Sequence, residues 1–117
     1  MDKKNCIVIA AGGTGGHVFP SISLAYYLMK DYDIEVFTDE RGIKYLNNHK
    51  NIKIKKIISS RVFSKNIIYF IIGIVKVFLS IISSIMLLIK RKPKLIIGMG
   101  GYSSFPVCLS GFLLKIP

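Results

Sequence analysis

Hydrophobic and polar residues alternate along the chain in blocks that predict strands and helices in turn. Short apolar runs rich in β-branched residues, together with one lysine–isoleucine alternation, predict strands, whereas apolar positions repeating at helical spacing predict helices. The predicted strands cover residues 5–11, 34–38, 52–58 and 95–97. The predicted helices cover residues 18–30, 43–48, 67–89 and 105–114. Because strands and helices alternate, we expect a parallel sheet with right-handed crossovers, an α/β fold of the Rossmann-like class.

The segment 67–89 differs from the others because it is almost wholly apolar and long enough to span a bilayer. When residues are placed about 100° apart, as in a helix, the few small or polar residues in it and at its ends share one stripe roughly 100° wide. This stripe consists of Asn66, Gly73, Lys76, Ser80, Ser83, Ser84 and Arg91. Basic residues flank the segment at positions 61, 65 and 90–92. The pattern predicts an amphipathic helix with an unusually wide apolar face.

Three interpretations of this helix are open. A helix packed in the core needs a narrower apolar face. A membrane span would bury Lys76 at a cost of about 2.5–3.5 kcal/mol, and it would place two strands of one sheet on opposite sides of the membrane. A helix at the membrane interface accounts for the width, the stripe and the flanking charge together, so we favour it. The side chains then expected to face the membrane are Ile68, Ile71, Ile72, Val75, Phe78, Leu79 and Ile82.

Four glycines surround one threonine between the first predicted strand and the first predicted helix. The loop consists of Gly12, Gly13, Thr14, Gly15 and Gly16. Without Cβ atoms such a loop can turn tightly, and its backbone can approach an anion closely. The helix that follows points its unpaired N–H groups and the positive end of its dipole at the same place. A tight turn without a ligand would need fewer glycines, so the loop predicts a phosphate site.

A second junction of strand, glycine loop and helix occurs near residue 100. Its loop reads Gly98-Met99-Gly100-Gly101-Tyr102-Ser103-Ser104. The two serines are candidate N-caps of the last helix. Because both loops follow strands of a parallel sheet, we expect them at the carboxyl edge, where open α/β sheets bind ligands. Two glycine loops facing one crevice predict a phosphate site more strongly than either loop alone.

His17 lies in the first turn of the helix after the first loop, beside the expected anion. The positive end of the helix disfavours an imidazolium, so one role is a neutral ring that accepts a proton. The other role is donation of a hydrogen bond to phosphate, and the sequence leaves both open.

The 117-residue chain carries a formal net charge of +11, which indicates one small domain with an anionic partner. A membrane surface or a phosphorylated substrate fits this charge. Nucleic acid does not, because the basic runs lack the interleaved aromatic residues of RNA-binding sheets. Cys6 and Cys108 are expected to be unpaired thiols in a reducing, cytoplasmic compartment. Cys-x-x-Cys and His-rich metal spacing do not occur, and neither a metal nor a cofactor is expected.

Two rival motifs are weaker. The pattern G-x-G-x-x-G is not met, because its third glycine would fall at Val18. Asp39, after the second strand, could still bind a ribose hydroxyl, so a dinucleotide-binding Rossmann domain is an alternative. The segment 31–33 has the D-x-D spacing of metal–nucleotide sites, but we interpret it as a solvated turn. His49 is expected in a polar connector.

With both loops identified, the chain resembles the N-terminal domain of the MurG family, glycosyltransferase family 28. The matching segments are 12–20, which reads GGTGGHVFP, and 98–102, which reads GMGGY and is followed by Ser103 and Pro106. Residues 91–94, before the fourth strand, resemble the family's lead-in to the second loop. The resemblance covers essentially the whole chain but only about the first third of a family member.

The resemblance implies the two-domain glycosyltransferase-B fold, with residues 1–117 as an incomplete N-terminal domain on the acceptor and membrane side. Family members transfer N-acetylglucosamine from UDP-N-acetylglucosamine (UDP-GlcNAc) to the muramyl-pentapeptide on undecaprenyl diphosphate during peptidoglycan synthesis. The transfer proceeds with inversion and without an obligatory metal. The family patch that 67–89 matches faces an anionic membrane surface, which implies a peripheral protein at the cytoplasmic face of the inner membrane.

The resemblance also assigns residues. Thr14, Gly15 and Gly16 match positions that bind UDP-GlcNAc, and His17 matches the loop histidine, a candidate base or phosphate partner. The residues matched to diphosphate recognition are Gly12, Gly13, Gly100, Gly101, Tyr102 and Ser103.

This chain lacks the family's acceptor loop beyond position 117 and the C-terminal donor domain. Because a transferase must hold donor and acceptor together, we expect a truncated domain that is inactive alone. One alternative is the membrane-associated subunit of a split glycosyltransferase, completed by a partner subunit. Another is a peripheral membrane-binding module without catalytic use.

Overall fold

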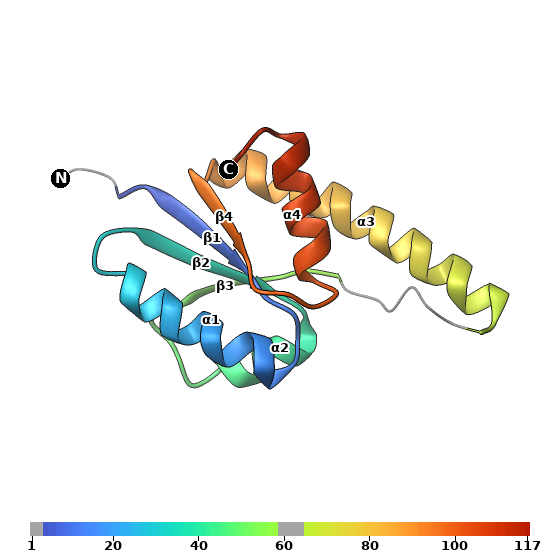
Figure 1. Ribbon diagram of the computed structural model, residues 1–117, viewed down its shortest axis with the longest axis horizontal. Coiled ribbons are helices and arrows are strands. Elements are labelled where there is room, and N and C mark those ends of the chain that lie inside the picture. Colours follow the sequence, from blue (N-terminus) through green and yellow to red (C-terminus); the bar gives the residue numbers. More distant parts are fainter. Residues whose placement is uncertain (1–3, 59–64) are drawn as a thin grey trace.

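The computed structural model describes residues 4–58 and 65–117, in which four parallel strands form one sheet with helices on both faces (Figure 1). The strands are β1 (Cys6–Ala10), β2 (Asp33–Thr38), β3 (Lys53–Lys56) and β4 (Leu95–Gly98). Their order is β3-β2-β1-β4, and every neighbouring pair is parallel. The predicted α/β fold with a parallel sheet is confirmed.

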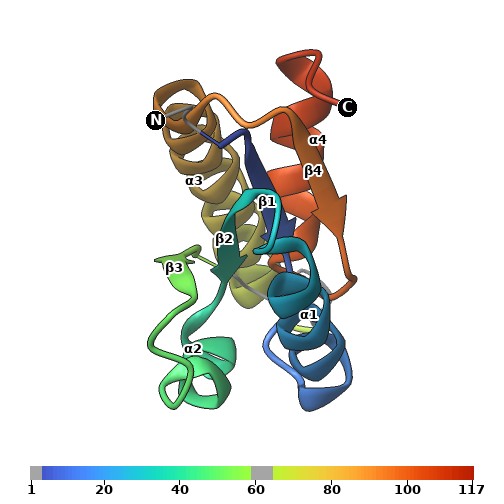
Figure 2. The same ribbon diagram turned by 90° about the vertical axis from the view of Figure 1, so that its left-hand side faces the viewer.

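The helices divide between the two faces of the sheet, as Figure 2 shows. They are α1 (Gly15–Leu28), α2 (Glu40–Leu46), α3 (Ile67–Arg91) and α4 (Ser104–Leu113). One core, beneath α1 and α2, contains Ile7, Ile9, Val18, Ile22, Ala25, Ile34, Val36, Leu46 and Ile52. The other, beneath α3 and α4, contains Val8, Ala10, Phe37, Ile57, Leu88 and Val107. Because a strand alternates its side chains, β1 must be apolar at every position, which is why its sequence indicated burial on both faces.

Two helices begin three residues earlier than predicted. Helix α1 begins at Gly15, because the carbonyl of Thr14 already accepts from the amide of Val18 at 3.0 Å. Pro20 therefore lies in the second turn of α1. Helix α2 begins at Glu40, because the carboxylate of Asp39 caps it. Strand β3 is shorter than predicted and keeps only the centre of the lysine–isoleucine alternation.

Helix α3 turns its small residues inward and its apolar side outward. Gly73, Ser80 and Ser84 are buried, and the helix packs against α4, where Ser110 Oγ donates to the carbonyl of Ile81 at 3.1 Å. Small side chains let two helices approach closely. Lys76, from the same predicted stripe, is exposed. Part of the predicted stripe therefore packs inside the protein, and part of it faces solvent.

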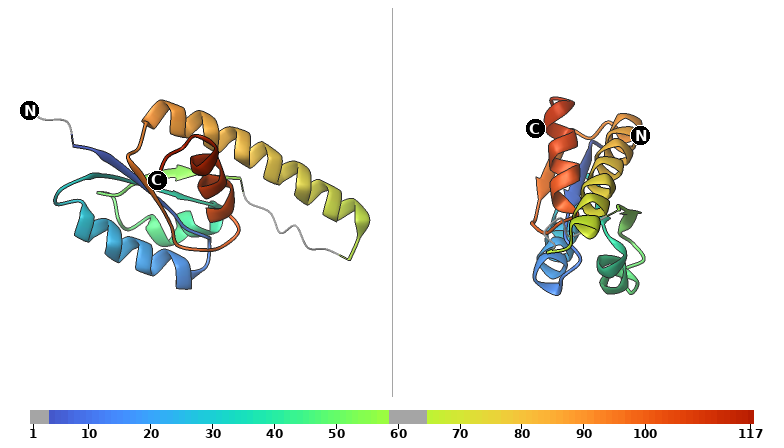
Figure 3. Two further views of the ribbon diagram at one scale, coloured as in Figure 1. Left: turned by 45° about the horizontal axis from the view of Figure 1, so that its top comes forward. Right: turned by 90° about the vertical axis from the view of Figure 1, so that its right-hand side faces the viewer.

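The apolar face of α3 is open to solvent. Ile68 is 65% exposed and Ile82 is 54% exposed. The first turns of α3 extend beyond the sheet and beyond α4 (Figures 1 and 3). Within residues 4–58 and 65–117, α3 is the one helix long and apolar enough to cross a membrane, by length and composition. A helix buried in the core, one of the three interpretations, is not what the structure shows.

The interpretation of residues 31–33 as a solvated turn is wrong for Asp33, because Asp33 is the first residue of β2. Its carboxylate accepts from Lys53 Nζ at 2.8 Å and from the Arg91 guanidinium at 3.2 Å. The turn itself is limited to the residues before it. Cys6 and Cys108 are both free thiols, as predicted.

Candidate functional site

The two glycine loops contact each other at the carboxyl edge of the sheet. The amide of Gly12 donates to the carbonyl of Gly100 at 2.7 Å, and the amide of Met99 donates to the carbonyl of Ala10 at 2.8 Å. The contact arises because β1 and β4 are neighbours, so the loops that follow them leave the sheet side by side. The prediction that both loops share one edge is confirmed.

Three glycines are required by this loop contact itself. Gly100 and Gly101 have φ values of 101° and 93°, a backbone region that L-residues rarely adopt. A Cβ atom on Gly12 would lie 2.6 Å from the Cα atom of Gly101. Gly13 is required by a different contact, because a Cβ atom added there would clash with Asp39 Oδ1. Part of the glycine pattern therefore serves packing between backbone segments and not only the approach of a ligand.

Gly16 differs from these, because a Cβ atom added there would meet only Thr14 Oγ1, at 3.9 Å. Gly15 and Gly16 are the first two residues of α1, so no earlier carbonyl of the helix accepts from their amides. Gly16 is also exposed. The start of α1 thus offers N–H groups and open space in the same place, which is the arrangement that binds an anion.

His17 lies between the two loops. Its Nδ1 atom is 2.8 Å from Thr14 Oγ1. A Cβ atom on Gly100 would lie 3.0 Å from both Cδ2 and Nε2 of the same ring. The ring therefore packs against the second loop while its Nδ1 side is held by the first. If Thr14 donates to Nδ1, then Nε2 carries the proton and can donate to phosphate; if Nδ1 donates to Thr14, then Nε2 is free to accept a proton.

Ser103 is placed differently from its prediction as a capping side chain. It is fully buried, and its hydroxyl donates to the carbonyl of Ala11 at 2.7 Å instead of capping α4. Ser104, the other candidate cap, is the first residue of α4, and its Oγ atom lies 3.8 Å from Cys108 Sγ. Ser103 thus ties the second loop to the end of β1. Gly100, Gly101 and Tyr102 of the second loop are exposed.

The carboxylate of Asp39 caps the helix α2 that follows it. Its Oδ1 accepts from the amides of Arg41 at 3.0 Å and Gly42 at 3.1 Å, and its Oδ2 pairs with the Arg41 guanidinium at 3.1 Å. With 7% of its side chain exposed, the carboxylate is not presented to a ribose. This removes the observation on which the dinucleotide-binding alternative depended. His49 follows α2, and its Nδ1 lies 2.9 Å from the Tyr26 hydroxyl.

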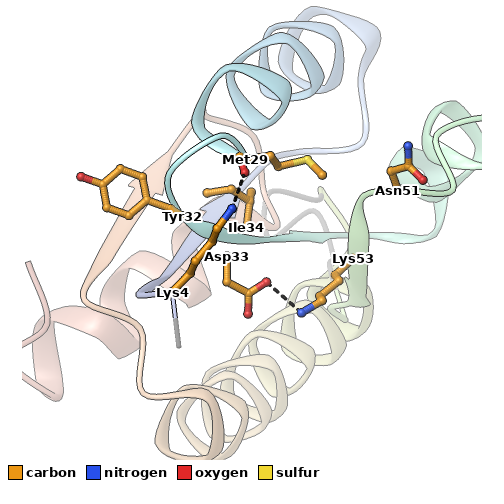
Figure 4. A pocket seen from close by; sticks show the side chains of 7 residues that line it. All are labelled: Lys4, Met29, Tyr32, Asp33, Ile34, Asn51 and Lys53. Carbon is orange, nitrogen blue, oxygen red and sulfur yellow. Dashed lines mark hydrogen bonds and ion pairs between the residues drawn. The ribbon is translucent and has the colours of Figure 1, made fainter. Parts of the chain in front are cut away.

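A cavity of about 310 Å³ lies at the amino end of β2, the edge opposite the glycine loops (Figure 4). It is lined by Lys4, Met29, Tyr32, Asp33, Ile34, Asn51 and Lys53. The Lys4 ammonium donates to the carbonyl of Met29 at 3.3 Å, and Lys53 pairs with Asp33. Both lysines already have partners in the protein, so this cavity is a weaker candidate for an anion site than the glycine loops. Among the described residues, no group of three or more His, Cys, Asp or Glu side chains could hold a metal ion.

The chain is similar to known glycosyltransferases. A family model described as the glycosyltransferase family 28 N-terminal domain matches residues 7–117. The UDP-N-acetylglucosamine--N-acetylmuramyl-(pentapeptide) pyrophosphoryl-undecaprenol N-acetylglucosamine transferase of Borreliella burgdorferi is 42% identical over 125 residues, covering 99% of this chain and 33% of the relative. The enzyme of the same name from Pelagibacter ubique is 36% identical, with 99% and 32% covered.

A solved structure matches as well. The crystal structure of Acinetobacter baumannii MurG aligns with a TM-score of 0.77 and 26% sequence identity, covering 97% of this chain and 34% of that chain. The chain therefore spans about a third of the length of the relatives and of the solved structure that it matches.

Proposed function

This chain belongs to glycosyltransferase family 28, and from this we propose that it forms the N-terminal, acceptor-side part of a glycosyltransferase-B enzyme. The proposed reaction is transfer of N-acetylglucosamine from UDP-GlcNAc to the muramyl-pentapeptide on undecaprenyl diphosphate. One observation carries the proposal: the two glycine loops meet at one edge of the sheet with the ring of His17 between them. Both the donor and the acceptor of this reaction contain a diphosphate, the group that such an arrangement recognises.

In this proposal the start of α1 binds phosphate oxygens through the amides of Gly15 and Gly16, and Thr14 lies beside them. The second loop, through Gly100, Gly101 and Tyr102, forms the other wall. Gly12 and Ser103 act by holding the walls together, since their contacts are with Gly101 and Ala11, whereas Gly13 packs the first loop against Asp39.

His17 then has two possible functions in the transfer. Accepting the proton of the attacking acceptor hydroxyl requires a free Nε2, and stabilising the diphosphate requires a protonated Nε2. The bond to Thr14 decides between them, because whichever group donates in it fixes the tautomer of the ring.

Membrane attachment through α3 is the third part of the proposal. The side chains predicted to face the membrane are all exposed: Ile68, Ile71, Ile72, Val75, Phe78, Leu79 and Ile82. A surface this apolar needs a partner, and the exposed Lys90 in the last turn of the helix suits anionic headgroups. We place the protein at the cytoplasmic face of the membrane, where a lipid-linked acceptor would present its diphosphate to the loops.

The chain alone is proposed to be inactive. Its relatives are about three times as long, and transfer requires both substrates to be oriented in one water-excluding cleft. The remaining elements would be supplied by further polypeptide or by a partner subunit.

A chimera tests this proposal. The chain would replace the matching third of the Borreliella burgdorferi relative, and transfer from UDP-GlcNAc to a lipid-linked acceptor would be measured for the chimera and for the isolated chain. We expect activity in the chimera, none in the chain, and loss of activity in a chimera carrying His17→Ala. Transfer by the isolated chain, or full activity of the His17→Ala chimera, would refute the assignment.

A further inference from the structure

A second cavity, of about 510 Å³, lies between β3 and the last turns of α3. It is lined by Glu35, Lys53, Ile54, Lys55, Leu87, Lys90 and Arg91. The end of α3 leads into the start of β4, whereas the glycine loops follow the strands' carboxyl ends. The cavity is therefore separate from the diphosphate site.

The acidic groups at this cavity are already neutralised. Glu35, buried on β2, forms an ion pair with the Arg91 guanidinium. The same guanidinium lies 3.2 Å from the carboxylate of Asp33, which also accepts from Lys53 at 2.8 Å. The hydrogen bond from Lys53 is the main reason that the pKa of Asp33 lies below its usual value. Arg91 and Lys53 are therefore committed to carboxylates.

Two lysines of the cavity are not committed. Within residues 4–58 and 65–117, neither the Lys55 ammonium nor the Lys90 ammonium has a hydrogen bond or an ion pair. The register pairs Lys55 with Phe37, whose side chain belongs to the core beneath α3 and α4, so Lys55 projects from the same face of the sheet. Lys90 reaches the cavity from α3 itself. The cavity thus combines two ammonium groups without partners and neighbouring carboxylates that are already paired with Lys53 and Arg91.

The cavity also lies on the flank of the apolar face of α3. Lys76 and Lys90 are about four turns apart and share one side of the helix, roughly a quarter turn from the centre of the exposed apolar face. An interfacial helix buries its apolar face at the boundary between headgroups and acyl chains. With α3 attached in this way, its flank and the cavity beside Lys90 would be level with the lipid phosphates.

We propose that this cavity binds a phosphate ester, held by Lys55 and Lys90, and that anionic lipid headgroups supply it when α3 lies on the membrane. The inference rests on the proposed membrane attachment of α3. A soluble phosphate ester has the same chemistry, so the experiment separates the two sources.

Flotation of the full chain with phosphatidylcholine vesicles, with and without phosphatidic acid, tests the lipid source. The test variant is Lys55→Gln with Lys90→Gln. The control variant is Lys44→Gln with Lys50→Gln, which removes the same charge from α2 and its following connector. We expect the gain in affinity given by phosphatidic acid to fall at least about tenfold more in the test variant than in the control. Equal losses in both variants would overturn the lipid source.

A titration with glycerol 3-phosphate, followed by NMR, tests the soluble source. Shifts at Lys55 and Lys90 that vanish in the test variant, without a difference in flotation, would assign the cavity to a soluble ester. No difference between the variants in either experiment would overturn the proposal. Binding to phosphatidylcholine alone reports separately on the apolar face, and the chimera assay reports on the transferase, so their failures are distinguishable from this one.

Discussion

The Nδ1 atom of His17 lies 2.8 Å from Oγ1 of Thr14, the residue that precedes α1. Thr14 therefore positions the imidazole ring that lies between the two glycine loops. We proposed that Thr14 lies beside the bound phosphate groups, and the geometry gives the same hydroxyl a contact with His17. It sets which nitrogen of His17 carries the proton toward the second loop.

Replacing this hydroxyl should therefore change the imidazole and not the fold. We expect Thr14→Val to remove the tautomer preference of His17, because the ring then loses its partner, while Thr14→Ser retains it. Nitrogen chemical shifts of the imidazole, measured by NMR on the chain, report the tautomer directly. An unchanged pattern in Thr14→Val would mean that the bond to Thr14 does not set the tautomer.

Gly12 and Gly16 should respond oppositely to alanine. Gly12→Ala places a Cβ atom 2.6 Å from the Cα atom of Gly101, so we expect a loss of about 1–3 kcal/mol in the free energy of unfolding. Gly16→Ala meets open space in the first turn of a helix, so we expect a gain of about 0.4–1 kcal/mol. Urea unfolding measures both. Equal destabilisation by the two substitutions would show that Gly16 is also a packing residue.

Ser103→Ala should destabilise the fold by about 1–3 kcal/mol, because it removes a buried hydroxyl that donates to the carbonyl of Ala11. The matched control is Ser23→Ala on α1, where the side chain is exposed and the change should stay within about 0.5 kcal/mol. Urea unfolding of both variants checks this. If the two variants unfold alike, Ser103 does not hold the second loop to β1.

Stability should fall in acid through Asp33. Its pKa in the folded chain lies below the ordinary value, chiefly because Lys53 donates to its carboxylate. A depressed folded pKa contributes stability above the unfolded pKa, and this contribution is lost as pH falls through the folded pKa, a window below about pH 4. Unfolding measured against pH should show a shallower acid limb in Asp33→Asn than in Asp31→Asn, an exposed control. Identical acid limbs would contradict the role of Asp33.

The exposed face of α3 should govern binding to neutral vesicles. We expect Phe78→Ser with Ile82→Ser to weaken flotation with phosphatidylcholine at least about tenfold, because each apolar side chain contributes about 1.5–3 kcal/mol when buried. Tyr27→Ser, on the exposed side of α1, serves as the control and should have little effect. Equal effects from the two changes would argue against a membrane-facing α3.

The sheet, the edge shared by the two loops and the position of His17 were all predictable from sequence, because each depends on local pattern and on the rules of parallel sheets. The capping of α2 by Asp39 was missed, although Asp followed by helix-forming residues is a recognised start signal. Recognising this cap would have placed the start of α2 at Glu40. It would also have weakened the assignment of Asp39 to a ribose hydroxyl.

Other features depend on tertiary contacts that no local pattern contains. The helical spacing placed Ser80 and Ser84 on one side of α3, but only the packing against α4 shows that these two serines face inward. The sequence alone does not show whether the Ser103 hydroxyl accepts from an amide of α4 or donates to a carbonyl distant in the sequence. The need for glycine at position 12 comes from Gly101, far away in the sequence.

The most direct test of the central claim is a titration of the isotopically labelled chain with a short-chain prenyl diphosphate, followed through its backbone amide signals. If the two glycine loops bind diphosphate, the amides of residues 12–16 and 100–102 should shift together, and Gly16→Ala should abolish these shifts while the fold persists. Shifts confined to other parts of the chain, or undiminished shifts in Gly16→Ala, would contradict the claim.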